Sequence, residues 1–128
     1  MKTPVIYNSD LHFEHLLWKN ELLFWKDEIK TFQNRLVEIE DRWTDENILK
    51  ELGQFKDSFI AHKKHVEDYL EEISGHELNI AKHYEIHVNV IDIPDLKRHE
   101  EIREIMETER GIYHELKDEF FKFISKYM

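Results

Sequence analysis

The chain has 128 residues, of which 41% are hydrophobic and 36% charged, with only three glycines and two prolines; this composition indicates one helix-rich folded domain over residues 1–128. A formal charge of −10 excludes nucleic acid and anionic membranes as partners attracted by bulk electrostatics. The absence of cysteine excludes disulfides and thiolate ligands, so a metal site must use His, Asp and Glu.

The first predicted element is a helix over residues 10–42. Ser9 and Asp10 can cap its start, because their side-chain oxygens accept hydrogen bonds from free N–H groups of the first turn. Large apolar residues then recur at alternating steps of four and three: Leu11, Trp18, Leu22, Trp25, Ile29, Phe32, Leu36, Ile39 and Trp43. His15 occupies one position of this seam, where the pattern asks for an apolar side chain.

The second predicted element is a helix over residues 45–83, after a break at DRWTDEN where Thr44 or Asp45 can act as the cap. Its seam reads Ile48, Leu52, Phe55, Phe59, His62, Val66, Tyr69, Ile73, His76, Ile80, His83 and His87. An unbroken helix over the whole seam would be about 60 Å long, so we expect a kink or an end near Ser74 and Gly75 or soon after.

The third predicted element is a helix over residues 94–127. It follows VNVIDIP at 88–94, whose β-branched residues and final proline are typical of an extended connector. The third seam reads His99, Ile102, Met106, Glu109, Tyr113, Leu116, Phe120, Phe123 and Tyr127. Glu109 needs a partner if it is buried, and Lys, Arg, His65 or Tyr69 can supply one; alternatively it acts as a general base or supports a ligand.

These elements predict an all-α fold, an antiparallel up-down-up bundle, because short connections force neighbouring helices to run in opposite directions. The C-terminal apolar arc is wider than one seam requires, and Phe24 lies outside the first seam. Another helix could cover such a face, supplied by a homodimer, by another helical partner or by a fourth helical piece from a kinked second segment. The alternative is that a single wide core of the bundle buries all of these residues. The arc comprises Phe120, Phe121, Phe123, Ile124 and Tyr127.

The expected pairing of the helices gathers histidines at one end of the bundle. If the first reversal centres near residue 44, positions i and about 88 − i lie side by side, so His12 faces His76 and His15 lies near residue 73. If the second reversal lies at 84–94, positions j and about 180 − j pair, so His99 faces residues 80–83. The six histidines of this end are His12, His15, His76, His83, His87 and His99, whereas His62, His65 and His114 lie elsewhere.

Imidazoles beside carboxylates are ligands of divalent transition metals, so this end is a candidate site for zinc, iron or manganese. The candidate ligands are His12, His15, His76, His83, His99 and Glu77. An open coordination position would permit oxygen or hydrolytic chemistry, but no residue pattern selects a reaction. No phosphate-binding loop or nucleotide motif indicates an organic cofactor. Two alternatives are a metal-free, pH-sensitive histidine cluster and a metal-free dimeric interaction or scaffold protein.

Several stretches carry a resemblance across nearly the whole chain. NSDLHFEH, RWTD, SGHE and the ending LKDEFFKFISKYM resemble a family of small all-helical bacterial proteins without an established reaction, which implies a helical cytoplasmic protein. Cytoplasmic location is also expected because the N-terminus lacks an apolar leader and no apolar run is long enough to span a membrane.

Metal-binding bundles offer a weaker likeness. The HYEIH stretch at 83–87 has the His-x-x-x-His spacing of hemerythrins, and His114, five residues before Glu119, is the second piece of this likeness. In the expected pairing of the helices, however, these two pieces would lie at opposite ends of the bundle. The Glu-x-x-His pairs of ferritin-like proteins are absent from the sequence. We therefore assign neither type of site.

Overall fold

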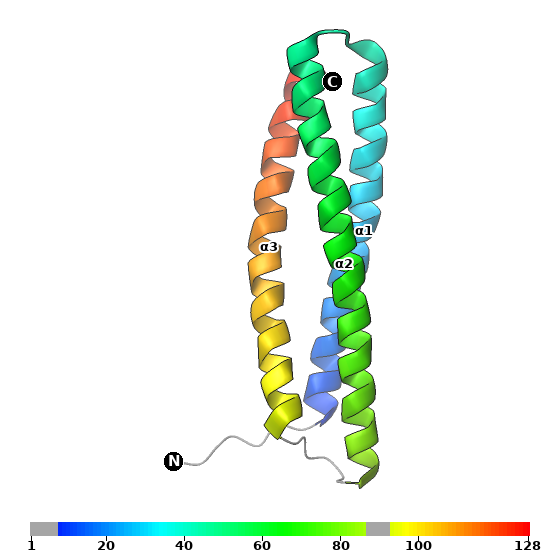
Figure 1. Ribbon diagram of the computed structural model, residues 1–128, viewed down its shortest axis with the longest axis vertical. Coiled ribbons are helices and arrows are strands. Elements are labelled where there is room, and N and C mark those ends of the chain that lie inside the picture. The colour runs from blue at the N-terminus through cyan, green and yellow to red at the C-terminus, as the bar shows by residue number, and fades with distance from the viewer. Residues whose placement is uncertain (1–7, 87–92) are drawn as a thin grey trace.

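The computed structural model describes the backbone of residues 8–86 and 93–128, and side chains within 10–79 and 95–128. Three helices follow one another: α1 (Asn8–Arg42), α2 (Glu46–Ile86) and α3 (Ile93–Tyr127). They lie side by side along their lengths, with α2 running opposite to α1 and α3 (Figure 1). The predicted all-α, up-down-up bundle is confirmed. None of the described helices combines the length and apolar content needed to cross a membrane.

The reversal between α1 and α2 is made by three residues and a side-chain cap. The carboxylate of Asp45 accepts hydrogen bonds from the backbone N–H groups of Asn47 at 2.9 Å and Ile48 at 3.2 Å. Trp43 was expected in the buried seam, and that prediction was wrong, because its side chain is 37% exposed. Its indole N–H instead donates to the carbonyl of Tyr127 at 2.9 Å, which ties the end of α3 to the turn.

Helix α2 is one 41-residue helix that continues through Ser74 and Gly75 and ends at Ile86, soon after Gly75 and three residues beyond the predicted end at residue 83. A single glycine costs a helix only about 1 kcal/mol relative to alanine. The buried seam residues Ile73 and His76 continue the packing on both sides of it. The predicted connector lies mostly outside the described residues, as does His87, and its last two residues begin α3.

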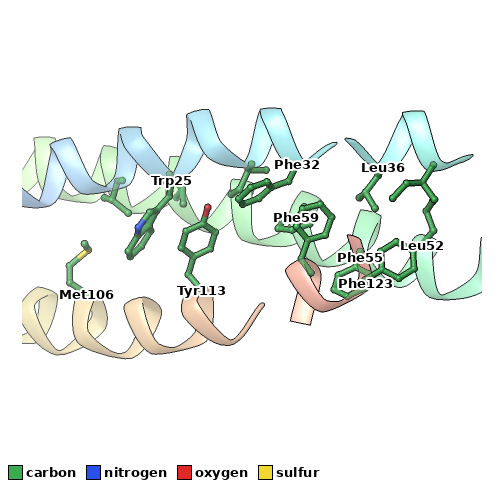
Figure 2. Close-up of a cluster of buried hydrophobic side chains, with 14 of the residues drawn as sticks. Trp25, Phe32, Leu36, Leu52, Phe55, Phe59, Met106, Tyr113 and Phe123 are labelled. Carbon is green, nitrogen blue, oxygen red and sulfur yellow. The ribbon is translucent and has the colours of Figure 1, made fainter. Parts of the chain in front are cut away.

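The core is apolar and aromatic toward the α1–α2 turn. Figure 2 shows phenylalanines from all three helices meeting there, and the ring centroids of Phe32 and Phe120 are 4.9 Å apart. The C-terminal arc divides between core and surface: Phe120 and Phe123 are buried, whereas Phe121 is exposed. One core therefore takes up most of this arc, and Phe24 on α1 stays outside it.

Helices α1 and α3 are joined in parallel register by three ion pairs that repeat every seven residues. Each carboxylate on α1 pairs with a cation 89 positions later: Glu14 with Arg103, Glu21 with Arg110, and Glu28 with Lys117. The residues of this ladder flank the buried seams on both helices, as charged residues do in parallel coiled coils. Such flanking pairs set the orientation and register of neighbouring helices.

Candidate metal centre

Three buried histidines form one layer of the bundle, one from each helix. His15 on α1, His76 on α2 and His99 on α3 have side chains that are at most 4% exposed. One ring nitrogen of each lies within 4.8 Å of the other two. Trp18 packs against this layer, with its ring centroid 5.6 Å from that of His15 and 4.8 Å from that of His99. The layer is thus enclosed by the helices that supply it.

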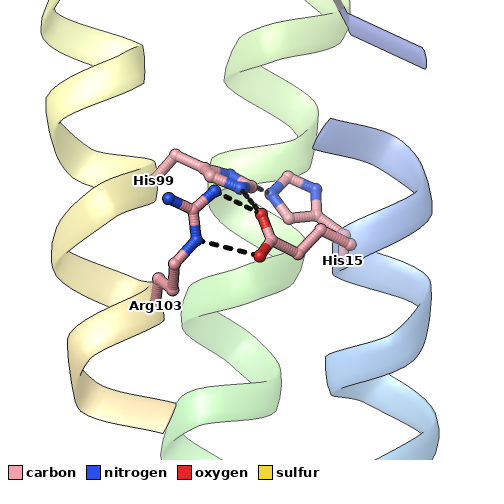
Figure 3. A network of polar contacts seen from close by, with 4 residues as sticks. His15, His99 and Arg103 are labelled. Atoms are coloured by element: carbon pink, nitrogen blue, oxygen red, sulfur yellow. Dashed lines mark hydrogen bonds and ion pairs between the residues drawn. The ribbon is translucent and has the colours of Figure 1, made fainter. Parts of the chain in front are cut away.

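A chain of hydrogen bonds orients His99. Its Nε2 lies 2.5 Å from Oε1 of Glu14, and its Nδ1 lies 3.0 Å from Nε2 of His15 (Figure 3). Arg103 donates two hydrogen bonds to the same carboxylate, at 2.9 and 2.7 Å. An ionised carboxylate only accepts, so Nε2 of His99 carries the proton and Nδ1 presents its lone pair to the layer.

The electrostatics keep this layer neutral at physiological pH. Burial, reinforced by the other histidines, lowers the pKa of both His15 and His76 to about 4. Burial also lowers the pKa of His99, against the opposing effect of Glu14. Arg103, more than His99, holds the pKa of the Glu14 carboxyl below its usual range. Neutral imidazole is the form that binds metals.

Two nitrogens of the layer have no hydrogen-bond partner, namely Nδ1 of His15 and Nε2 of His76. Leaving a buried polar atom unpaired costs about 1–3 kcal/mol. His76 therefore points a lone pair or an N–H into the protein interior at a free-energy cost that a fully apolar seam would avoid. An ion bound between the three rings would give the unpaired Nε2 of His76 a partner.

The predicted ligands separate into three groups. The structure brings together His15, His76 and His99, as the metal hypothesis required. His12 and Glu77 contact each other instead, with Nδ1 and Oε1 2.5 Å apart, on a surface where the His12 side chain is 66% exposed. Burial raises the pKa of Glu77, but Lys19 and His12 outweigh it and hold that pKa below its usual range. The side chain of His83 lies outside the described residues.

The expected pairing of helices was right to about one helical turn. His15 packs against His76 rather than near residue 73, with ring centroids 5.0 Å apart, and His76 packs against His99 at 5.5 Å. Sequence reasoning overlooked the roles of Glu14 and Arg103. The available signal was the seven-residue repeat of glutamates on α1 and of cations on α3, which predicts that these two helix flanks meet.

A second buried polar pair lies farther along the bundle, toward the α1–α2 turn. Nδ1 of His62 is 3.6 Å from Oε2 of Glu109, and Tyr69 donates a hydrogen bond to Oε1 of Glu109 at 3.3 Å. The ring of His62 also stacks on Tyr113, with centroids 4.8 Å apart and planes 6° from parallel. The expected partner Tyr69 is confirmed for Glu109, while the histidine beside it is His62 rather than His65.

Comparison of the chain with family models, with curated proteins and with solved structures finds no match.

Proposed function

We propose that the chain is a metal-binding helical bundle in which His15, His76 and His99 hold one divalent transition ion. The convergence of three buried, neutral imidazoles from three different helices carries this proposal. Tetrahedral zinc with Zn–N bonds of 2.0–2.1 Å needs ligand nitrogens about 3.3 Å apart. The observed 3.0 Å between His15 and His99 is close to that spacing, and small side-chain rotations would bring His76 to it.

The donor set favours zinc over manganese. Three neutral nitrogens suit zinc, copper, nickel or ferrous iron, whereas manganese prefers carboxylate oxygen. The nearby carboxylates are already engaged: Glu14 binds Arg103 and His99, and Glu77 binds Lys19 and His12. Glu14 then acts through His99, because a carboxylate that accepts from a ligating imidazole fixes its orientation and raises its basicity.

Three protein ligands leave a fourth coordination position on zinc, which a water molecule can fill. The ligand side chains are almost completely buried, so that position favours a small ligand over a macromolecular substrate. The supported role is therefore a buried ion that connects three helices. By linkage, an ion that binds only the folded protein adds about 2.7 kcal/mol of stability at a free concentration one hundred times its dissociation constant.

The test is a zinc titration of untagged, chelator-treated protein by calorimetry, with thermal unfolding measured on the same samples. We expect one zinc per chain and a higher midpoint of unfolding in zinc. His76→Ala should abolish both effects. His114→Ala removes an exposed histidine on α3 and should change neither, which makes it the matched control.

If wild-type protein binds less than a tenth of an equivalent of zinc, iron or manganese and its unfolding midpoint does not move, the layer is a hydrogen-bonded structural cluster. Equal binding by wild type and His76→Ala would place the ion elsewhere, and the proposal would then fail as well.

A further inference from the structure

The outer face of α1 carries an apolar strip in its N-terminal half. Five side chains there are between 48% and 61% exposed: Phe13, Leu16, Leu17, Leu23 and Phe24. They lie on the side of α1 opposite the buried seam, with exposed Asn20 in their middle. Beyond residue 24 the same face becomes polar, with Asp27, Thr31 and Asn34 exposed. The strip is thus a local feature and not a property of the whole helix.

The strip is symmetric about Asn20. Leu17 and Leu23 lie three positions from it, and Leu16 and Phe24 lie four positions from it on either side. In an antiparallel pair of α1 helices with a two-fold axis at Asn20, position i meets position 40 − i of the second copy. Leu16 then lies level with Phe24 of the other copy, and Leu17 with Leu23. A surface that contacts itself in this way is what a two-fold dimer requires.

The size and charge of the strip fit the same partner. An aromatic side chain has a surface of about 150–250 Å², and a leucine somewhat less, so the exposed part of the strip is on the order of 500 Å² per copy. A pair of copies would bury about 1,000 Å², which is the lower limit for a specific interface. Charged residues that flank it already pair with other helices of the same chain: Glu21 with Arg110, Lys19 with Glu77, and Lys26 with Glu67. Self-association through the strip therefore does not require any of these three ion pairs to break.

We infer that a second copy of this chain covers the strip, through antiparallel α1–α1 packing with Asn20 at the two-fold axis. Two asparagine side chains meeting at the axis can hydrogen-bond to each other, and a single polar residue in an apolar helix contact fixes its register. Phe13 lies seven positions from Asn20, level with Asp27 of the second copy, at the rim of the contact. The dimer uses the face of α1 opposite His15 and does not depend on a bound ion.

Light scattering and sedimentation at micromolar concentration, in the presence of chelator, test the association. Wild-type protein should have twice the mass of one chain, and Phe24→Glu should raise the dimer dissociation constant about a hundredfold or more. Ile60→Glu places the same charge at an isolated exposed residue on α2 and should leave the mass unchanged. Circular dichroism of each variant verifies that the helices are intact.

Cysteine cross-linking tests the geometry, because the native chain contains no cysteine. Asn20→Cys should form a disulfide-linked dimer in mild oxidant. Phe13→Cys should not, because the two copies of residue 13 would be about 21 Å apart along the helix axis at 1.5 Å per residue, well beyond the reach of a disulfide. A monomeric wild-type protein, a dimer that survives Phe24→Glu, or equal cross-linking at 13 and 20 would each overturn the inference.

Discussion

Among the side chains that the structure describes, imidazole is buried in two places, and the two places differ in what surrounds the ring. In the layer of His15, His76 and His99, neutral rings face one another, and the charged groups, Glu14 and Arg103, stand outside. At His62, by contrast, the ring lies beside the carboxylate of Glu109 and stacks on an aromatic ring. The first place brings the ring nitrogens of three imidazoles together, whereas the second places one imidazole next to a carboxylate.

The contrast shows why burial alone does not identify a ligand. Burial lowers the pKa of His62 too, but Glu109 opposes the shift because it stabilises the protonated ring. Among the described residues, one carboxylate, that of Glu14, directly contacts a ring of the three-histidine layer, and Arg103 binds the same carboxylate. Removing a histidine should therefore have opposite effects on stability in the two places, and four experiments follow from this difference.

Acid should produce the largest effect. His15 and His76 have a pKa of about 4 when folded and about 6.5 when unfolded, so between these values the unfolded chain binds more protons. The free energy of unfolding is therefore highest above pH 6.5, where both rings are neutral in both states. As the pH falls from 6.5 toward 4, it decreases by about 1.4 kcal/mol per pH unit for each group. Denaturant unfolding of chelator-treated protein from pH 7 to 4 measures it, and a flat profile would contradict the neutral layer.

His62→Leu should lower the free energy of unfolding by about 2 kcal/mol, because it removes the polar neighbour of the buried Glu109 carboxylate and the ring that stacks on Tyr113. Urea unfolding at pH 7 measures the change. His65→Leu, at an exposed position on the same helix, should shift stability by less than about 0.5 kcal/mol. If both substitutions have equally small effects, Glu109 does not depend on His62.

Replacing all three layer histidines with leucine should act in the opposite direction and raise the stability of the metal-free protein by about 2 kcal/mol. The reason is that well-packed apolar side chains replace buried polar groups with unpaired nitrogens. The same variant should lose the zinc response and the part of the acid sensitivity that belongs to His15 and His76. A loss of stability instead would show that the hydrogen-bonded layer favours folding without an ion.

Glu14→Gln should lower zinc affinity about 10- to 100-fold, because a neutral amide replaces the carboxylate that orients His99 and raises its basicity. Glu21→Gln is the matched control, since Glu21 makes the equivalent bidentate contact with Arg110 one heptad farther along. Calorimetric titrations of both variants measure the difference. Equal affinities would show that the Glu14–His99 contact does not tune the site.

Much of the fold could be predicted from the sequence, for identifiable reasons. The four-and-three stepping placed His15, His76, His99 and Glu109 in the seams, and all four are buried. Asp45 was one of two caps predicted for α2, and its carboxylate makes the capping contacts. These features are local, because they depend on the helical repeat and on side chains within one turn of a helix end.

The partners of the buried polar residues could not be predicted to the same accuracy. An error of three residues in register was enough to pair His12 with His76, where the structure places His15 against His76 and His12 against Glu77. His15 lies in the seam of α1, and His12 directly follows the seam residue Leu11, so the two histidines are less than one helical turn apart. Only the packing of three helices at once distinguishes the exposed ring from the buried one.

The sequence by itself determined three amphipathic helices and the histidines that interrupt their seams, because helical periodicity is written in consecutive residues. The tertiary structure decided which imidazoles converge, that Glu14 and Arg103 orient His99, and that His62 lies beside Glu109. Those contacts join residues about 20 to 90 positions apart, and their geometry depends on the relative rotation and axial shift of three helices. Side-chain packing and the heptad ladder of ion pairs set these quantities, which no single helix specifies.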